Sequence, residues 1–304
     1  MMASEEALAQ YRAAREGAAF AVFADWGVLR FAGPERMKFL QGLMTSDVAA
    51  LAPGQNGWSC LLTAKGRIRA HALLLAREQE ILALGPGAAL RNMAEDFGRV
   101  ILLSQTTMSS AEDLSAPILL LGPGAADLAA RVPAALDVLA ARDERFSPPG
   151  TWLPTPKDRS EKILAALQSA GAARLGAEAF EMLRLESGVA AFGRELGEEV
   201  FPQEARLEAE VSLNKGCYLG QEIMSRLSRR GHVNRLLVRL KLAGPEVPAA
   251  GTKVLVSGRE SGSTAGAAYS PREGAALAFA FLRREDAAAG TRAELVGGRP
   301  AEII

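Results

Sequence analysis

The chain is poor in cysteine: of its 304 residues, only Cys60 and Cys217 carry a thiol. Two thiols can form at most one internal disulfide, which excludes a small secreted fold held together by several disulfides. They also fall short of the four thiolates that usually hold an iron–sulfur cluster. We therefore predict no resident metal site in this chain.

Long apolar runs and an excess of charge of one sign are also missing. Apolar residues make up 49% of the chain, but no run approaches the roughly 20 residues needed to cross a bilayer. Residues 1–6 include acids where a secretory signal has basic residues. We expect a cytoplasmic monomer with no membrane partner. The 35 basic and 35 acidic side chains balance, so net charge gives no reason to expect direct nucleic-acid binding.

The most informative segment is KGCYLGQE at residues 215–222, where Cys217 stands between two glycines and close to Lys215. The glycines permit backbone angles closed to other residues. A neighbouring cation such as Lys215 would favour the thiolate, which is the nucleophilic form of cysteine. Cys217 and Lys215 are therefore candidate catalytic residues. The alternative is that Cys217 packs as a small, inert hydrophobic side chain.

Positive charge follows this segment directly, and it has two interpretations. The first is a solvated helix face, on which Glu222 and Arg226 form an i,i+4 pair that contributes about 0.3 kcal/mol. The second is an anion site, because guanidinium groups bind carboxylates through paired hydrogen bonds. The basic residues of this stretch are Arg226, Arg229, Arg230, His232 and Arg235.

The first half of the chain repeats one pattern, an apolar strand followed by a Gly-Pro turn and a helix, at residues 28–34, 81–86 and 118–123. Proline suits the first turn of a helix, so helices should begin near 34, 86 and 123. Further strands are expected at 58–62 and 69–76. This alternation predicts an α+β fold with helices covering one face of a sheet.

The second half changes character twice. Four prolines at residues 148–156 predict an irregular connection. Helices are expected from about 160 and over 177–186, the latter ending at Gly188. From about 234, four short β-like runs, at 235–240, 252–256, 266–269 and 275–281, are separated by Gly and Pro and predict a small antiparallel sheet or barrel. We therefore expect an α+β domain over 1–145, a second α+β part over 146–233 and a β domain over 234–304.

Several segments together resemble the YgfZ family of folate-binding, iron–sulfur-related proteins, which is similar in turn to the glycine-cleavage T-protein. The cysteine segment carries most of this resemblance. The basic stretch that follows it and three further segments are also similar: FLQGLMTSDV at 39–48, RLESGVAAFG at 184–193 and FPQEA at 201–205. The resemblance implies a T-protein-like multidomain fold around a central folate cavity, with a small terminal β domain.

The same resemblance implies particular ligand contacts for tetrahydrofolate. In the T-protein pattern the glutamate of Arg-Leu-Glu-Ser-Gly binds the pterin ring, which points to Glu186. A carboxylate can accept paired hydrogen bonds from pterin N–H groups. Without the motif, Glu186 would be interpreted as a helix-terminal acid paired with an arginine. Arg226, Arg229 and Arg235 are the expected contacts of the folate glutamate tail.

One departure from the T-protein pattern concerns its pair of aspartates, because Ala70 and His71 stand in their place. Alanine can neither accept a proton nor hold an amine, and an imidazole differs from a carboxylate in charge. A lone histidine on a strand is more often structural than functional. The loss argues against aminomethyl transfer in glycine cleavage.

The resulting hypothesis is a tetrahydrofolate-binding protein that supports assembly or repair of iron–sulfur clusters in client enzymes, including those that modify tRNA. Because this chain lacks four thiolates, the clusters would be held by those clients. One alternative is a folate-dependent one-carbon transferase or demethylase. Another is a structural adaptor that retains an unused pocket.

Overall fold

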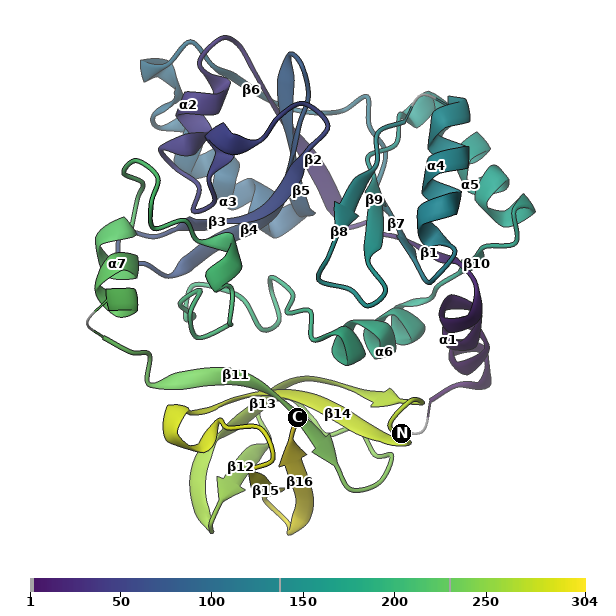
Figure 1. The fold of residues 1–304 in the computed structure, drawn as a ribbon, viewed down its shortest axis with the longest axis vertical. Helices are drawn as coiled ribbons and strands as arrows, with labels where there is room; N and C mark the ends of the chain where they lie inside the picture. Colours follow the sequence, from purple (N-terminus) through teal and green to yellow (C-terminus); the bar gives the residue numbers. More distant parts are fainter. Residues whose placement is uncertain (1–2, 137, 230) are drawn as a thin grey trace.

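The computed structural model describes residues 3–136, 138–229 and 231–304. Two open β-sheets and one closed β-barrel are arranged around the centre of the molecule (Figure 1). The helix α6 (Ala177–Ser187) lies between the sheets and the barrel. Arg230, one of the basic residues predicted to follow the cysteine segment, lies outside the described residues.

The first sheet has the strand order β3-β4-β5-β2-β6, and all its pairs are antiparallel. The strands expected at 58–62 and 69–76 are β3 and β4, and the helices expected near 34 and 86 are α2 and α3. Gly33 makes the turn after β2 with a φ of 102°, and a Cβ there would meet the Gln105 carbonyl at 2.3 Å. The elements are β2 (Trp26–Ala32), α2 (Arg36–Gln41), η1 (Val48–Ala50), β3 (Asn56–Leu62), β4 (Ile68–Ala76), β5 (Glu80–Pro86), α3 (Gly87–Gly98), η2 (Ile101–Leu103) and β6 (Thr107–Ser110).

The second sheet has the order β10-β1-β7-β9-β8 and combines segments from both sides of the boundary expected at 145/146. That boundary cuts the hairpin of β8 and β9. The expectation of an irregular connection over 148–156 is also wrong in part, because β9 forms inside it between the prolines. The elements are β1 (Ala19–Val22), β7 (Ile118–Leu121), α4 (Ala125–Leu136), β8 (Ala141–Asp143), β9 (Gly150–Leu153), η3 (Lys157–Arg159), α5 (Ser160–Ser169) and β10 (Ala173–Arg174).

Two helices join the second sheet to the barrel. The helix α1 (Glu5–Glu16) begins at Ser4, whose side chain accepts a hydrogen bond from the N–H of Ala7. The helix α6 ends as expected at Gly188, which adopts the left-handed conformation with a φ of 73°. Arg239 of the barrel donates to the Glu186 carbonyl over 2.6 Å, so the end of α6 is attached to the barrel wall.

The C-terminal β domain is a closed barrel with the order β11-β14-β13-β12-β15-β16, in which β16 pairs with β11. A separate apolar cluster that includes Leu240, Val254 and Leu282 fills its interior. The four expected runs lie in the first four strands, whereas the last two strands were not predicted. The strands are β11 (Arg235–Leu242), β12 (Lys253–Val256), β13 (Arg259–Ser270), β14 (Ala275–Arg283), β15 (Arg292–Leu295) and β16 (Arg299–Ile303), with η5 (Arg284–Asp286) before β15.

The segment between α6 and the barrel contains η4 (Glu208–Glu210) and α7 (Gln221–Arg229). In Figure 1, α7 lies at the edge of the first sheet, away from the second sheet. Within the described ranges, the helices are too short or too polar to span a membrane.

Candidate functional site

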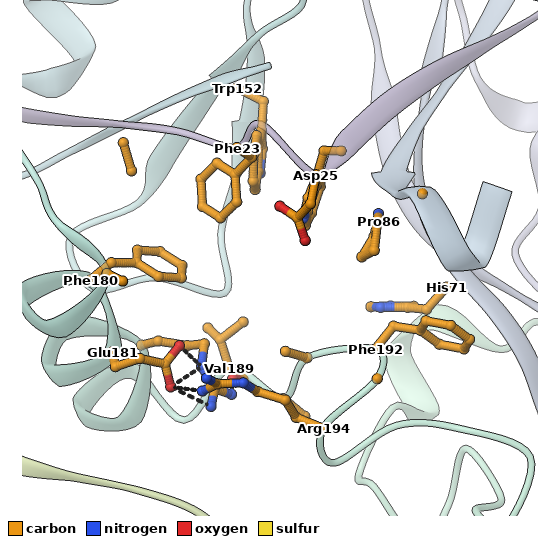
Figure 2. Close-up of a pocket in the computed structure, with 18 of the residues that line it drawn as sticks. Phe23, Asp25, His71, Pro86, Trp152, Phe180, Glu181, Val189, Phe192 and Arg194 are labelled. Atoms are coloured by element: carbon orange, nitrogen blue, oxygen red, sulfur yellow. Dashed lines mark hydrogen bonds and ion pairs between the residues drawn. The ribbon is translucent and has the colours of Figure 1, made fainter. Parts of the chain in front are cut away.

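A cavity of about 710 Å³ lies where the two open sheets meet α6 (Figure 2). The turn between β1 and β2 and the start of α3 form one side of it. The opposite side consists of α6 and the segment 189–194 that follows it. Since these segments are far apart in the sequence, the cavity exists only in the folded chain.

Aromatic side chains form the inner wall of the cavity. Trp26 stacks on Trp152 with ring centroids 4.5 Å apart and planes at 16°. Phe23 packs against Trp152 at 4.9 Å and against Phe180 of α6 at 5.0 Å. Trp58 completes the group, and its indole N–H is buried with no hydrogen-bond partner among the described residues. The wall therefore offers flat apolar surfaces, which suit a planar ring.

Asp143 supports this wall from behind. Its fully buried carboxylate accepts hydrogen bonds from Arg145 at 2.9 Å and from the indole N–H of Trp152 at 3.0 Å. Arg145 in turn lies 3.5 Å above the ring of Trp58. Burial raises the pKa of Asp143, but the charge of Arg145 and the donated hydrogen bonds lower it more, so the net pKa lies below its ordinary value.

A network of ion pairs forms the α6 side of the cavity. Arg184 is 2% exposed and donates to Glu181 at 2.9 Å and to the buried Glu195 at 2.8 Å. Glu181 also accepts from Arg194, whose side chain is half exposed. Figure 2 shows Glu181 and Arg194 facing the cavity. The charges compensate one another, yet Glu181 and Arg194 keep edges that a ligand can reach.

Asp25 lies opposite this network, in the turn between β1 and β2. Its carboxylate points into the cavity in Figure 2. Among the described residues, no hydrogen bond or ion pair engages that carboxylate, although the Asp25 carbonyl accepts from the N–H of Gly87 at 2.8 Å. Asp25 is thus an acid available to a ligand with N–H donors.

His71 lies in the cavity wall on β4, and it belongs to a buried polar cluster. Its Nε2 is 2.6 Å from a carboxylate oxygen of Glu210, and its ring stacks on Trp58 at 4.6 Å. Cys60 faces His71 across the β3–β4 pair. Burial and then the charge of Glu210 raise the pKa of the Cys60 thiol well above its ordinary value. The ligand atoms of Cys60, His71 and Glu210 all lie within 4.8 Å of one another.

The expectation that Glu186 contacts a ligand in the cavity is not met by its position. Its carboxylate is fully buried between α6, α1 and the barrel, outside the cavity lining. It accepts from Tyr11 at 2.9 Å, and also from Arg15 and Ser270. All of these partners hold structural elements together. Glu186 therefore joins the helices to the barrel, while Glu181, on the same helix, faces the cavity.

The predicted tail-binding arginines also lie away from the cavity lining. Arg226 pairs with Glu222 at 2.7 Å on the exposed face of α7, as the solvated-face interpretation expects. Arg229 is exposed at the end of that helix. Arg235 donates to Glu204 at 3.1 Å and to the Glu199 carbonyl at 2.6 Å. The arginines in the cavity lining are instead Arg91, Arg145, Arg184 and Arg194.

Cys217 lies in an exposed loop before α7, outside the cavity lining, whereas Cys60 is buried. Lys215 directs its ammonium group to the carbonyls of Gln41, at 2.7 Å, and Met44. Burial lowers the pKa of Lys215 to about 8, and the negative charge of Asp47 opposes this shift. Lys215 therefore attaches the cysteine loop to the end of α2.

The glycines of the cysteine segment differ in what they do. Gly220 has a φ of 82°, and a Cβ there would lie 3.0 Å from the Thr63 carbonyl. Gly66, in the turn between β3 and β4, has a φ of 76°, and a Cβ there would lie 2.9 Å from Met224 of α7. Gly216 has open space around its Cβ position. One glycine of the pair thus serves the close docking of α7 on the first sheet.

Sequence reasoning missed most of the cavity. Trp26, Trp58 and Trp152 are all the tryptophans of the chain, and they meet at one wall. The small number of tryptophans was the signal in the sequence that could have pointed to the cavity. Burying an indole N–H without a hydrogen-bond partner costs free energy, so each buried tryptophan calls for an explanation. Asp25 and Glu181 lie in no motif that the sequence analysis used, so neither was predicted as a site residue.

Comparison with known proteins agrees with this architecture. Residues 235–303, which form the barrel, match the family described as the glycine cleavage T-protein C-terminal barrel domain. The glycine cleavage system aminomethyltransferase T from Bartonella henselae has a similar structure, with a TM-score of 0.84 over 98% of this chain and 88% of that chain at 18% identity. The expected T-protein-like α+β fold is therefore confirmed.

Two kinds of relative are similar in sequence over most of the chain. The tRNA-modifying protein YgfZ of Photorhabdus laumondii is 26% identical over 247 residues, 75% of this chain and 72% of that protein. An aminomethyltransferase of Rubrobacter xylanophilus is 28% identical over 302 residues, 91% of this chain and 79% of that protein. The resemblance predicted from the motifs is confirmed: the chain is similar both to proteins named YgfZ and to the aminomethyltransferases, whose barrel domain and fold it shares.

Proposed function

We propose that this protein binds tetrahydrofolate in the central cavity and supports the assembly or repair of iron–sulfur clusters in client enzymes, including enzymes that modify tRNA. The observation that carries the proposal is the cavity, with its aromatic wall and unengaged carboxylate, in a chain similar to YgfZ and to aminomethyltransferases. The client enzymes follow from the YgfZ resemblance and are part of the proposal.

The residues of the cavity fit the chemistry of a folate. A pterin has flat faces, which the rings of Trp26, Trp152 and Phe180 can contact. It also has N–H donors, for which the Asp25 carboxylate is available. The volume of about 710 Å³ lies in the range of small-molecule sites.

Each part of the cavity then has a role in holding the ligand. Asp25 accepts hydrogen bonds from the ring N–H groups, while the half-exposed Arg194, on the opposite side of the cavity, attracts the carboxylates of the glutamate tail. Asp143 keeps Arg145 and Trp152 in place behind the wall. Tetrahydrofolate, when bound, supplies a carrier for one-carbon groups.

Cys217 acts at a different place in this proposal. Its thiol is exposed on the loop before α7, so it can reach a client protein while the cavity holds the folate. The thiol is a nucleophile and a soft metal ligand, and both properties suit a transient contact with a cluster enzyme. Lys215 positions the loop through the carbonyls at the end of α2.

A second candidate function is a folate-dependent one-carbon transferase, which one feature of the cavity favours. His71 lies in the cavity wall, oriented by Glu210 at 2.6 Å, and an imidazole held by a carboxylate can transfer a proton. Aminomethyl transfer in glycine cleavage is not expected, because Ala70 and His71 stand in place of the two acids of that pattern.

The test of folate binding is calorimetric titration of the intact protein with tetrahydrofolate under anaerobic conditions. Asp25→Asn should weaken binding ten- to a hundredfold, since losing a charged hydrogen-bonding partner costs about 1.5 to 3 kcal/mol. Asp127→Asn, an exposed aspartate on α4, is the matched control and should bind as the wild type does. Absence of saturable binding, or equal affinity for Asp25→Asn, would overturn the folate assignment.

The cluster-support arm is tested separately in cells that lack this protein. The activity of cluster-dependent enzymes should fall and should return when the intact gene is restored. Unchanged enzyme activity, together with turnover of methylamine donors by the purified protein, would favour the one-carbon transferase instead.

A further inference from the structure

The buried cluster of Cys60, His71 and Glu210 has the composition of a metal site, and the folate-binding and cluster-support function proposed above does not use it. Three different donor types meet there: a thiol, an imidazole and a carboxylate, all on buried residues. Each of them alone has an ordinary structural explanation. Their three donor atoms, which come from three separate segments, lie within 4.8 Å of one another, and this convergence requires a further explanation.

The β-sheet register brings two of these donors together. Cys60 of β3 and His71 of β4 are directly opposite each other in an antiparallel pair, so their side chains lie on the same face of the sheet. Glu210, at the end of η4, covers that face and approaches His71 to 2.6 Å. The three donor atoms need only small shifts to reach the separations of roughly 3 to 4 Å found around a tetrahedral ion.

A second layer of hydrogen bonds holds the segments in register. The Thr45 hydroxyl accepts from the N–H of Cys60 at 2.9 Å and donates to the carbonyl of Glu210 at 2.9 Å. The Thr45 N–H also donates to the Cys60 carbonyl at 2.9 Å. One buried side chain thus sets the spacing between two of the three candidate ligands, as outer-shell residues do in metal sites.

The site also has an entrance and balanced charge. His71 lies in the wall of the 710 Å³ cavity, whereas Cys60 and Glu210 lie outside its lining. The His71 side is therefore where an ion would enter and where its fourth position would face. A divalent ion bound by one thiolate and one carboxylate leaves no net charge in the buried site, which limits the cost of desolvation. Thiolate and imidazole ligands together favour zinc over magnesium or calcium.

We propose that Cys60, His71 and Glu210 form a three-ligand zinc site in the wall of the cavity, with an open fourth position. Binding forms Zn–S, Zn–N and Zn–O bonds, and the Cys60 proton is released to solvent. The hydrogen bond between His71 and Glu210 is replaced by the bonds of both side chains to the ion, and the neutral imidazole, bound through Nε2, carries its one proton on Nδ1. No oxidation or reduction takes place.

The test uses the full chain after removal of metal with a chelator. Zinc added in competition with a chromophoric chelator should bind at one equivalent per chain. His71→Gln and Glu210→Gln should each weaken the affinity by about tenfold or more, and Thr45→Val by about tenfold through the outer layer. Thermal unfolding followed by circular dichroism identifies any variant that has lost its fold.

Replacing zinc with cobalt gives a spectroscopic test that requires no substitution of a buried residue. In Cys217→Ser, an exposed substitution, Cys60 is the sole remaining thiol. A thiolate-to-cobalt charge-transfer band in that variant must therefore come from Cys60, and we expect to see it. Absence of the band in folded Cys217→Ser, or absence of stoichiometric zinc binding by the wild type, would overturn the proposal.

Discussion

The central cavity and the cysteine loop are opposite in almost every property. The cavity is built from segments distributed over residues 21–194, and its wall consists of aromatic rings and paired charges. The cysteine loop is one continuous segment, exposed at Cys217 and attached to the first sheet by α7 and Lys215. The segment that is easiest to recognise in the sequence therefore lies away from the aromatic-walled cavity.

This difference separates two tasks within one protein. A small ligand needs enclosure, which only the meeting of the two sheets and α6 supplies. A client protein needs an accessible group, which an exposed thiol supplies. The two regions should therefore respond independently to substitution, and the following experiments test that independence.

The largest effect is expected from Cys217→Ser in cells. Serine keeps the shape but is a far weaker nucleophile and metal ligand, so in-cell support of cluster enzymes should be lost. Folate affinity and thermal stability should stay unchanged, because the side chain is exposed. Asn214→Ser, on the same exposed loop, is the control and should complement fully. Full complementation by Cys217→Ser would remove the thiol from the mechanism.

Glu186→Gln should affect stability rather than binding. The change leaves the buried end of Arg15 without its charged partner, and a broken ion pair of this kind costs about 2 to 4 kcal/mol when one partner keeps some contact with water. Urea unfolding measures the loss. The folded variant should bind tetrahydrofolate as the wild type does. A large drop in affinity at unchanged stability would return Glu186 to the ligand site.

Asp143→Asn should produce a pH-dependent loss of about 2 kcal/mol, because a charged acceptor of two side-chain donors is replaced by a neutral one. The folded pKa of Asp143 is lowered below its unfolded value of about 3.9, so its contribution is complete above about pH 5. The contribution disappears as the pH falls through the lowered pKa. Unfolding curves of both proteins should therefore converge in acid, and a constant difference down to low pH would contradict the assignment.

The smallest effects on folate affinity are expected for two arginines, one in the cavity lining and one on the exposed face of α7. Arg194→Ala, in the cavity lining, should weaken folate binding severalfold, since partly exposed charge pairs contribute about 1 kcal/mol or less. Arg226→Ala, on the exposed face of α7, should leave the affinity unchanged. Calorimetry of the two variants in parallel decides which arginine serves the ligand. The reverse ranking would support the original expectation from the sequence.

Most of the fold was predictable from local patterns. Gly-Pro turns predicted the starts of α2, α3 and α4. Apolar runs predicted β3, β4 and the first four barrel strands. The strand β9 was missed because prolines flank it, while its pairing with β7 and β8 overrides the local signal. The strands β15 and β16 are short and polar, and the barrel closes only through them.

The candidate site was less predictable, and Glu186 and Glu181 show why. Both are acids on α6, and a motif selected the first of them. Which acid faces the cavity depends on what packs against each side of the helix. Tyr11 and Ser270 donate hydrogen bonds to the Glu186 carboxylate, whereas Glu181 lies in the cavity lining, where a ligand can contact it. The sequence of a helix does not show which distant segments will pack against each of its faces.

The sequence by itself determined the T-protein-like resemblance, through its motifs, and also the α+β class and the small terminal β domain. The class and the terminal domain depend on local patterns of apolar residues, glycine and proline, which act through short-range backbone preferences. Only the tertiary structure decided where the three tryptophans meet, which acid faces the cavity and how Cys60, His71 and Glu210 converge. Those arrangements depend on contacts between segments far apart in the chain, and such contacts form only when the sheets and helices pack together.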